Sequence, residues 1–144
     1  MPEAPLEFED DPRIAADYVL YRRIPPGRAK ETPAGIVRPN SDTLDFAPRH
    51  KAIEMGLPGP CMSLGSQLIL QEKGLGPEAM LEDHEEYGLV SFRAIELRAV
   101  GLSLQVWPYP YAWHVVAFNT EWERIPKAAR KALAESAVWV LEPP

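Results

Sequence analysis

A histidine and a serine are the residues of this sequence whose types suggest acid–base or nucleophilic chemistry. His114 stands within the apolar run WHVVAF, and imidazole often accepts or donates a proton near neutral pH. Ser41 carries a hydroxyl beside Asp42, although a serine in the segment NSD is equally typical of a turn or a helix cap. We therefore take His114 and Ser41 as candidate catalytic residues, with a structural histidine and a capping serine as the alternatives.

Five cations are candidates for binding an anion. Arg22 and Arg23 end the first predicted strand, and the planar guanidinium group suits a carboxylate or a phosphate. Arg38 lies in a long proline-rich loop. Lys127 and Arg130 lie near the start of the last predicted helix, where the helix dipole disfavours cations, so their placement favours an anion site. Solvated or ion-paired surface side chains are the alternative for all five.

An aromatic corner joins two predicted strands within residues 102–118, LSLQVWPYPYAWHVVAF. Pro108 and Pro110 each fix φ near −65° and remove a backbone donor, so the connection is stiff. The second strand is a nearly continuous apolar run, which is typical of a strand covered on both faces. The aromatic side chains form either a packed core or a recognition surface for a base or a partner side chain: Trp107, Tyr109, Tyr111 and Trp113.

The remaining elements follow from hydrophobic periodicity and from glycine, proline and capping residues. We expect a strand over 17–24, a short strand near 36–37, a strand over 61–64 with a helix to 71, helices over 77–87 and 91–100, the two corner strands, a helix over 126–137 and a closing strand over 138–142. Residues 89–92 could instead form a strand, but we prefer a helix that Ser91 caps. The expected fold is α+β, a small single domain with a mixed or antiparallel sheet of about 4–6 strands, about 3–4 short helices and a long proline-rich loop.

The charged residues are distributed unevenly. Residues 1–16 form an acidic arm, either mobile or paired with the basic segment that follows, and residues 17–144 form the domain. The net charge of −6 argues against binding bulk nucleic acid, whereas the basic excess in 18–51 allows a small anionic ligand. No apolar run approaches the ~20 residues of a membrane span, and the acidic N-terminus lacks an export signal. We expect a cytoplasmic protein that does not enter a membrane.

Several site classes are excluded by the absence of their motifs. The sequence contains no GxxxxGK[ST], GxGxxG, HExxH, CxxC or GxSxG. Cys61 is the single cysteine, so the chain forms no internal disulfide. Three histidines make a histidine-rich metal site improbable, and we expect neither a metal nor a cofactor.

The chain resembles a group of small bacterial proteins. The resemblance covers most of the chain and rests on these segments: LYRRIPP (20–26), VRPNSDTL (37–44), CMSL (61–64), PYAWHVVAF (110–118) and KAARKALAESAVWV (127–140). It implies a compact α+β domain of bacterial origin, encoded in a multi-gene locus of the defence or toxin kind. It assigns no reaction and no catalytic residue.

The chain is also similar, more distantly, to ADP-ribosyltransferase-like folds. Those folds open with a strand of the form LYR or LYHG and later bring a serine-containing strand to the nicotinamide site. Leu20-Tyr21-Arg22 and Ser63 would stand in those places here. The later glutamate motif of those enzymes has no recognisable counterpart in this sequence.

Two functions follow as hypotheses. In the first, the protein is an accessory module that binds a protein encoded in the same operon through its aromatic corner. In the alternative, it is a small enzyme or ligand-binding domain that acts on a nucleotide-like anion through Arg23, Arg38, Ser41 and His114. The sequence leaves open whether the protein is an enzyme.

Overall fold

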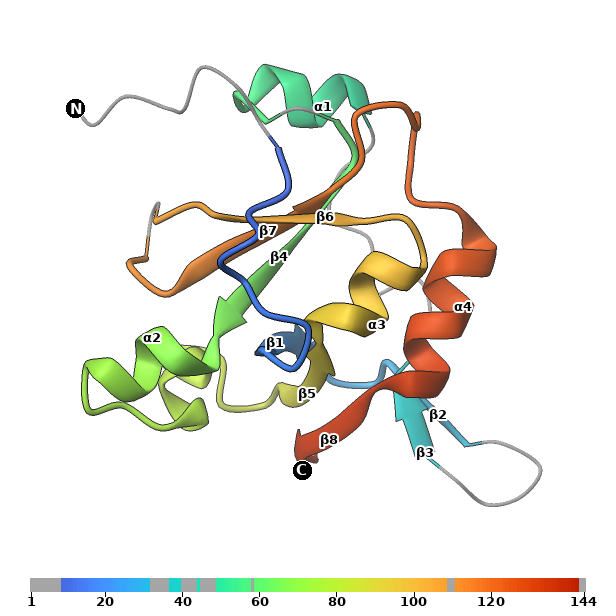
Figure 1. Cartoon of the computed structure of the whole chain (residues 1–144). Helices are drawn as coiled ribbons and strands as arrows, with labels where there is room; N and C mark the ends of the chain where they lie inside the picture. Colours follow the sequence, from blue (N-terminus) through green and yellow to red (C-terminus); the bar gives the residue numbers. More distant parts are fainter. Residues whose placement is uncertain are drawn as a thin grey trace.

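Six strands form one antiparallel sheet in the part of the chain that the structure describes (Figure 1). The computed structural model describes residues 9–31, 37–39, 44, 49–57, 59–108 and 111–142. The strand order is β6-β7-β4-β1-β5-β8, and β2 and β3 pair separately. The strands are β1 Val19–Ile24, β2 Ala29–Glu31, β3 Val37–Pro39, β4 Cys61–Ser66, β5 Gly88–Arg93, β6 Ser103–Val106, β7 His114–Phe118 and β8 Val138–Leu141. The helices are α1 Arg49–Glu54, α2 Gln67–Glu72, the 3₁₀ helix η2 Pro77–Leu81, α3 Ala94–Ala99 and α4 Lys127–Ser136. The expected α+β class is confirmed.

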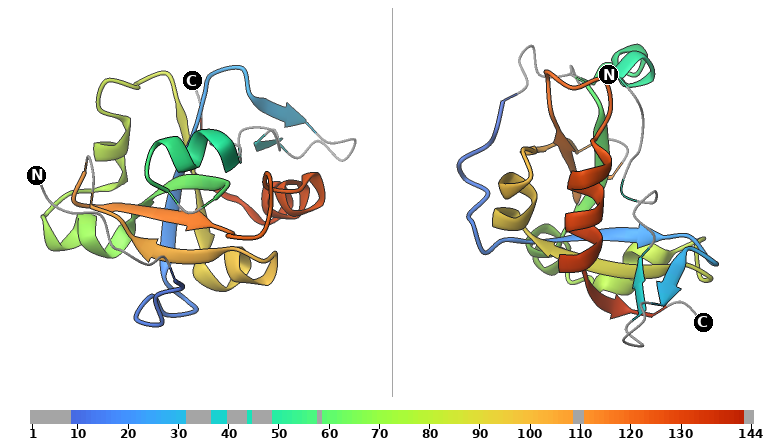
Figure 2. Two further views of the ribbon diagram at one scale, coloured as in Figure 1. Left: turned by 90° about the horizontal axis from the view of Figure 1, so that it is seen from above. Right: turned by 90° about the vertical axis from the view of Figure 1, so that its right-hand side faces the viewer.

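Helices cover both faces of the sheet. Leu20 and Ile24 of β1 belong to the largest apolar cluster, together with Leu97 of α3 and Leu133 of α4. Tyr21 points to the opposite face, because side chains alternate along a strand, and joins a second cluster with residues of α2 and η2. A third cluster lies beneath α1, and the left view of Figure 2 shows α1 and α3 on opposite sides of β7.

The strand β7 lies within the sheet between β6 and β4, and all five of its residues are buried. Val115 and Ala117 face the cluster that α3 and α4 cover, whereas Val116 and Phe118 face the cluster beneath α1. Burial of each large apolar side chain contributes about 1.5–3 kcal/mol, so the continuous apolar run specifies a doubly covered strand. The expected covering on both faces is confirmed.

The sheet is weakly joined at its centre. The strands β1 and β5 pair over six residue positions, but β1 and β4 pair over two, Leu20 with Ser66 and Tyr21 with Gly65. After Tyr21, the backbone pairing of β1 with β4 ends, and a side-chain contact follows: the Nη1 of Arg22 donates to the Ser63 carbonyl at 2.8 Å. The two strands therefore diverge here, and the divergence leaves space for a site.

The segment 9–18, most of it within the arm expected from the sequence, packs on the domain. Ile14 is buried in the main cluster, and the Asp11 amide donates to the Leu104 carbonyl of β6 at 2.7 Å. The carbonyls of Ala16 and Tyr18 accept the first free amides of α3, so this segment also satisfies the helix N-terminus. The carboxylate of Asp10 in this segment forms an ion pair with Arg98 of α3 at 3.1 Å. Arg98 lies outside the basic segment 18–51, with which the arm was expected to pair.

Two expected helices are corrected by the structure. Residues 88–93 form β5, so the helix that we preferred from Ser91 is wrong, and α3 begins at Ala94. The ladder to β1 decides this, since it pairs every residue of β5 with a residue of β1. The helix expected over 77–87 is shorter, because η2 ends at Leu81 and Asp83 takes a positive φ of 64° that no helix continues. The proline-rich segment 25–60 also contains β2 and α1, which periodicity did not predict.

Candidate functional site

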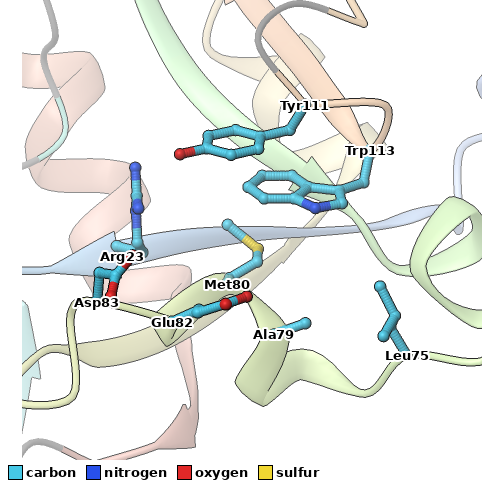
Figure 3. Close-up of a pocket in the computed structure, with 8 residues that line it drawn as sticks. All are labelled: Arg23, Leu75, Ala79, Met80, Glu82, Asp83, Tyr111 and Trp113. Carbon is cyan, nitrogen blue, oxygen red and sulfur yellow. The ribbon is translucent and has the colours of Figure 1, made fainter.

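A cavity of about 210 Å³ opens where β1 and β4 diverge, and its lining comprises Arg22, Arg23, Ser63, Leu64, Met80, Tyr111, Trp113 and His114. A second hollow of about 280 Å³ shares four of these residues and adds others from η2 and from the loops that follow α2 and η2 (Figure 3): Leu75, Ala79, Glu82 and Asp83. Because Arg23, Met80, Tyr111 and Trp113 line both, the hollows adjoin and form one groove. Each hollow is smaller than the usual small-molecule site of about 300–1,000 Å³, although the larger one comes close to the lower limit.

His114 and Ser63 form a hydrogen-bonded pair in the wall of this groove. In the β4–β7 ladder His114 lies opposite Gly65 and Ser63 opposite Val116, so the two side chains are diagonal neighbours on one face. The Nδ1 atom of His114 lies 2.8 Å from the Trp107 carbonyl, and a carbonyl only accepts, so we assign the ring proton to Nδ1. The Nε2 atom is then the acceptor for the Ser63 hydroxyl, with which it is in hydrogen-bond contact. His114 is 8% exposed.

Two guanidinium groups enter the groove from β1. Arg22 is anchored by its hydrogen bond to the backbone carbonyl of Ser63, the residue whose hydroxyl contacts His114. Arg23 is half-buried and lines both hollows, and Figure 3 shows its side chain extending toward the hydroxyl end of Tyr111. Among the described residues, none forms a hydrogen bond or an ion pair with the Arg23 guanidinium. That group is therefore available to a ligand.

Two stacked aromatic rings also line the groove. Tyr111 and Trp113 lie with ring centroids 4.6 Å apart and planes 3° from parallel. The Tyr111 carbonyl accepts the His114 amide at 3.1 Å, and the Trp113 carbonyl accepts the Ser66 amide at 2.8 Å, so the backbone holds the stack against β4. Tyr111 is 47% exposed, which leaves part of its ring open to the groove and to solvent.

Three other predicted anion-binding residues lie elsewhere. Arg38 donates to the Glu135 carbonyl near the end of α4, and the Nε of Arg130 donates to the Ile125 carbonyl at 3.2 Å. Lys127 is exposed at the start of α4. In the described part of the chain, none of the three belongs to the lining of the groove. The structure therefore unites Arg22, Arg23, His114, Tyr111 and Trp113, but not Arg38, Lys127 and Arg130.

The other candidates have different places. Ser41 and Tyr109 lie outside the described residues. The indole of Trp107 packs on the cluster beneath α1, and its carbonyl orients His114.

The comparisons with known proteins are negative. No family model matches this sequence, and neither the curated proteins nor the solved structures contain a match. Within the described residues, no helix combines the length and apolar character needed to cross a membrane, and no cluster of three or more His, Cys, Asp or Glu side chains could hold a metal ion.

Sequence reasoning from motifs missed three polar residues of the groove. Ser63 was singled out only through the likeness to ADP-ribosyltransferase-like folds, although the pattern CMSLGS places it on the same strand face as Gly65. Glu82 and Asp83 are exposed, yet they line the larger hollow. Only their position relative to the aromatic stack could identify them, and that position is set by tertiary structure.

Proposed function

We propose that the groove binds a small planar anion of the nucleotide type. One observation carries the proposal: guanidinium groups and a stacked aromatic pair line the same cavity. An aromatic ring that stacks on the face of Tyr111 that Trp113 leaves uncovered gains about 1–3 kcal/mol, as bases do on aromatic side chains in other proteins. A phosphate gains charge-assisted hydrogen bonds from a guanidinium group, whose planar donors match the phosphate oxygens.

The charges around the groove favour one orientation of the ligand. Arg22 lines the hollow that contains Ser63 and His114, Glu82 and Asp83 line the other hollow, and Arg23 lines both. A phosphate is repelled by the two carboxylates and attracted by the guanidinium groups. We therefore expect the phosphate to lie beside Ser63 and the ring to lie along Tyr111 and Trp113.

Calorimetric titration with AMP and ADP, and with adenosine as the uncharged analogue, tests this proposal. The change Arg23→Gln should weaken nucleotide binding about 10- to 100-fold, because a charged hydrogen bond is worth about 1.5–3 kcal/mol, and should leave adenosine binding unchanged. The change Tyr111→Leu should lower the affinity for the nucleotides and for adenosine by about tenfold. Lys127→Gln is the matched control, since Lys127 is exposed on α4 away from the groove.

Two results would refute the binding proposal. One is the absence of any heat or thermal shift with either nucleotide at millimolar concentration. The other is an equal loss of affinity in Arg23→Gln and Lys127→Gln, which would show a diffuse electrostatic effect rather than a site.

A second candidate function is that of an accessory module that binds a protein encoded by a neighbouring gene. The observation in its favour is the ring of Tyr111, which is 47% exposed beside the half-buried Trp113. Rigid aromatic side chains of this kind are common anchors in interfaces. Co-purification with each neighbouring gene product tests it: Tyr111→Leu should abolish capture, Arg23→Gln should retain it, and equal capture by all variants would reject it.

A further inference from the structure

We propose that Ser63 is a nucleophile that His114 activates toward a phosphate ester bound in the groove. The inference rests on the proposed function, because the reacting ester must enter the same groove. It adds an activity to a binding site, and it replaces Ser41 by Ser63 as the hydroxyl that acts with His114. The argument has three parts: the direction of the hydrogen bonds, the charge beside the serine and the balance of the reaction.

The hydrogen bonds around His114 have the direction that a general base requires. The Trp107 carbonyl holds the ring proton on Nδ1 at 2.8 Å and also fixes the orientation of the ring. The unprotonated Nε2 faces the hydroxyl of Ser63. A nucleophile, a base and a third group that orients the base form the arrangement by which serine enzymes activate a hydroxyl. Here a backbone carbonyl has the orienting role that a carboxylate has in many such enzymes.

The two members of the His114–Ser63 pair differ in how deeply they are buried. Both residues line the cavity, but His114 is more than nine-tenths buried, whereas Ser63 is half-buried. A ligand in the cavity can therefore reach the serine oxygen, while the imidazole is largely shielded from bulk water. A purely structural histidine needs no partner that faces an open cavity.

Two cations lie where negative charge would develop. The Nη1 of Arg22 is 2.8 Å from the carbonyl of Ser63 itself, and Arg23 lines the same cavity. Attack on a phosphate ester increases negative charge on the phosphoryl oxygens and on the leaving oxygen. Guanidinium groups in the same cavity, of which Arg22 is held by its hydrogen bond, stabilise the transition state more than the ground state, which accelerates the step.

The reaction balances without a cofactor. A bond forms between the Ser63 oxygen and phosphorus, the hydroxyl proton moves to Nε2 of His114, and the bond from phosphorus to the ester oxygen breaks. The leaving oxygen takes the proton from Nε2 and departs as an alcohol. Water then attacks the phosphoserine with His114 again as the base, and phosphate leaves as serine is restored.

An activated phosphonate, a p-nitrophenyl alkylphosphonate, tests the serine directly. The full-length protein should release one equivalent of p-nitrophenol and gain one phosphonyl group, which peptide mass mapping should locate on Ser63. Saturating AMP should slow this labelling. Ser63→Ala should abolish the adduct, and His114→Gln should slow its formation about 100-fold or more, as expected for loss of a general base. Ser103→Ala, which removes another half-buried serine of the sheet, should label as the parent does.

The outcomes separate this inference from the binding proposal. Nucleotide binding with no adduct on Ser63 would overturn the nucleophile and leave the binding site standing. An adduct on Ser63 that AMP does not slow, in a protein that binds no nucleotide, would overturn the phosphate ester as the substrate class. Labelling of Ser103 or of several serines at similar rates would show unselective chemistry and overturn the inference. Mapping on the parent protein gives these answers even if Ser63→Ala fails to fold.

Discussion

Gly65 of β4 lies directly against the side chain of Met80 from η2. A methyl group added to Gly65 would overlap the Met80 sulfur and would lie 2.8 Å from its terminal carbon and 3.2 Å from Cε3 of Trp113. The missing side chain therefore lets η2 and the aromatic stack close on the same point of the sheet. Both neighbours line the two hollows of the groove, so this contact sets its width.

The change Gly65→Ala should therefore damage the site more than the fold. We expect the free energy of unfolding to fall by about 1–3 kcal/mol, because Met80 is buried and must move to relieve the overlap. Nucleotide affinity should fall about tenfold as the aromatic wall shifts, since about 1.4 kcal/mol corresponds to that factor. Urea unfolding and calorimetric titration measure the two effects.

Gly76→Ala is the matched control for this change. The nearest atoms to a methyl group there belong to the carboxylate of Glu78, an exposed and flexible side chain that can move aside. Its effects on stability and affinity should therefore lie within about 0.5 kcal/mol of zero. Equal effects of the two substitutions would contradict the account of Gly65 as a close-approach position.

Ser66 should contribute to stability through two hydrogen bonds of one oxygen. Its side chain is fully buried, accepts the Ile69 amide at 3.2 Å as the N-cap of α2, and lies 2.7 Å from the Tyr18 hydroxyl. Ser66→Ala should lower the free energy of unfolding by about 1–2 kcal/mol, and Tyr18→Phe by about 0.5–1.5 kcal/mol. Because both changes remove the shared bond, the double variant should lose less than the sum. Strict additivity in urea unfolding would show that the bond contributes nothing.

Local signals in the sequence were sufficient for elements that a short pattern specifies. The apolar run that became β7 and the alanine-rich α4 both formed where the pattern placed them. The boundary between β5 and α3 was wrong because both a strand and a helix fit residues 88–100. The choice was made by pairing with β1, a strand about 70 residues earlier, which no local window contains.

The site was predictable to the extent that its residues lie on the predicted strands. Arg23 and His114 were identified by residue type, and the sheet brings them to one groove. Nothing in the sequence excluded Arg38 from the site, because only the tertiary fold shows that it lies against α4. The sequence could not identify the hydrogen-bond partner of His114 for a similar reason. The register of β4 with β7 places Ser63 beside it, and register is a property of the folded sheet.

The pH dependence of stability should include a contribution from Asp11. A side-chain hydrogen bond from Arg13 holds the pKa of the Asp11 carboxyl below its ordinary value of 3.8, with further help from the Arg13 amide and from nearby positive charge. A depressed pKa in the folded state means that the ionised carboxyl favours folding. This contribution is complete above the unfolded pKa and is lost as the pH falls through the folded pKa.

Arg13→Ala should therefore raise the pKa of Asp11 toward 3.8 and flatten the acid part of the stability curve. An NMR titration of the Asp11 carboxyl carbon measures the first effect, and urea unfolding between about pH 2 and 5 measures the second. An unchanged titration midpoint in Arg13→Ala would show that other groups set the pKa.

We expect Arg98 to hold the segment 9–18 on the surface of the domain. Its guanidinium pairs with the Asp10 carboxylate at 3.1 Å and donates to the carbonyls of Ile14 at 2.6 Å and Asp11 at 2.9 Å. Arg98→Ala removes all three contacts, so the free energy of unfolding should fall by about 1.5–3 kcal/mol. Arg93→Ala on the same helix is the control, because its exposed ion pair with Glu96 is worth about 0–1 kcal/mol.

Trypsin gives a local readout of the same contacts. The Arg13 side chain is 87% exposed, but cleavage after it requires the backbone to leave the domain surface, where the neighbouring Ile14 is buried. Cleavage after Arg13 should therefore accelerate in Arg98→Ala and stay at the parent rate in Arg93→Ala. If both variants are cleaved at the parent rate while Arg98→Ala is less stable, Arg98 stabilises the domain as a whole and the burial of Ile14 is what holds the segment.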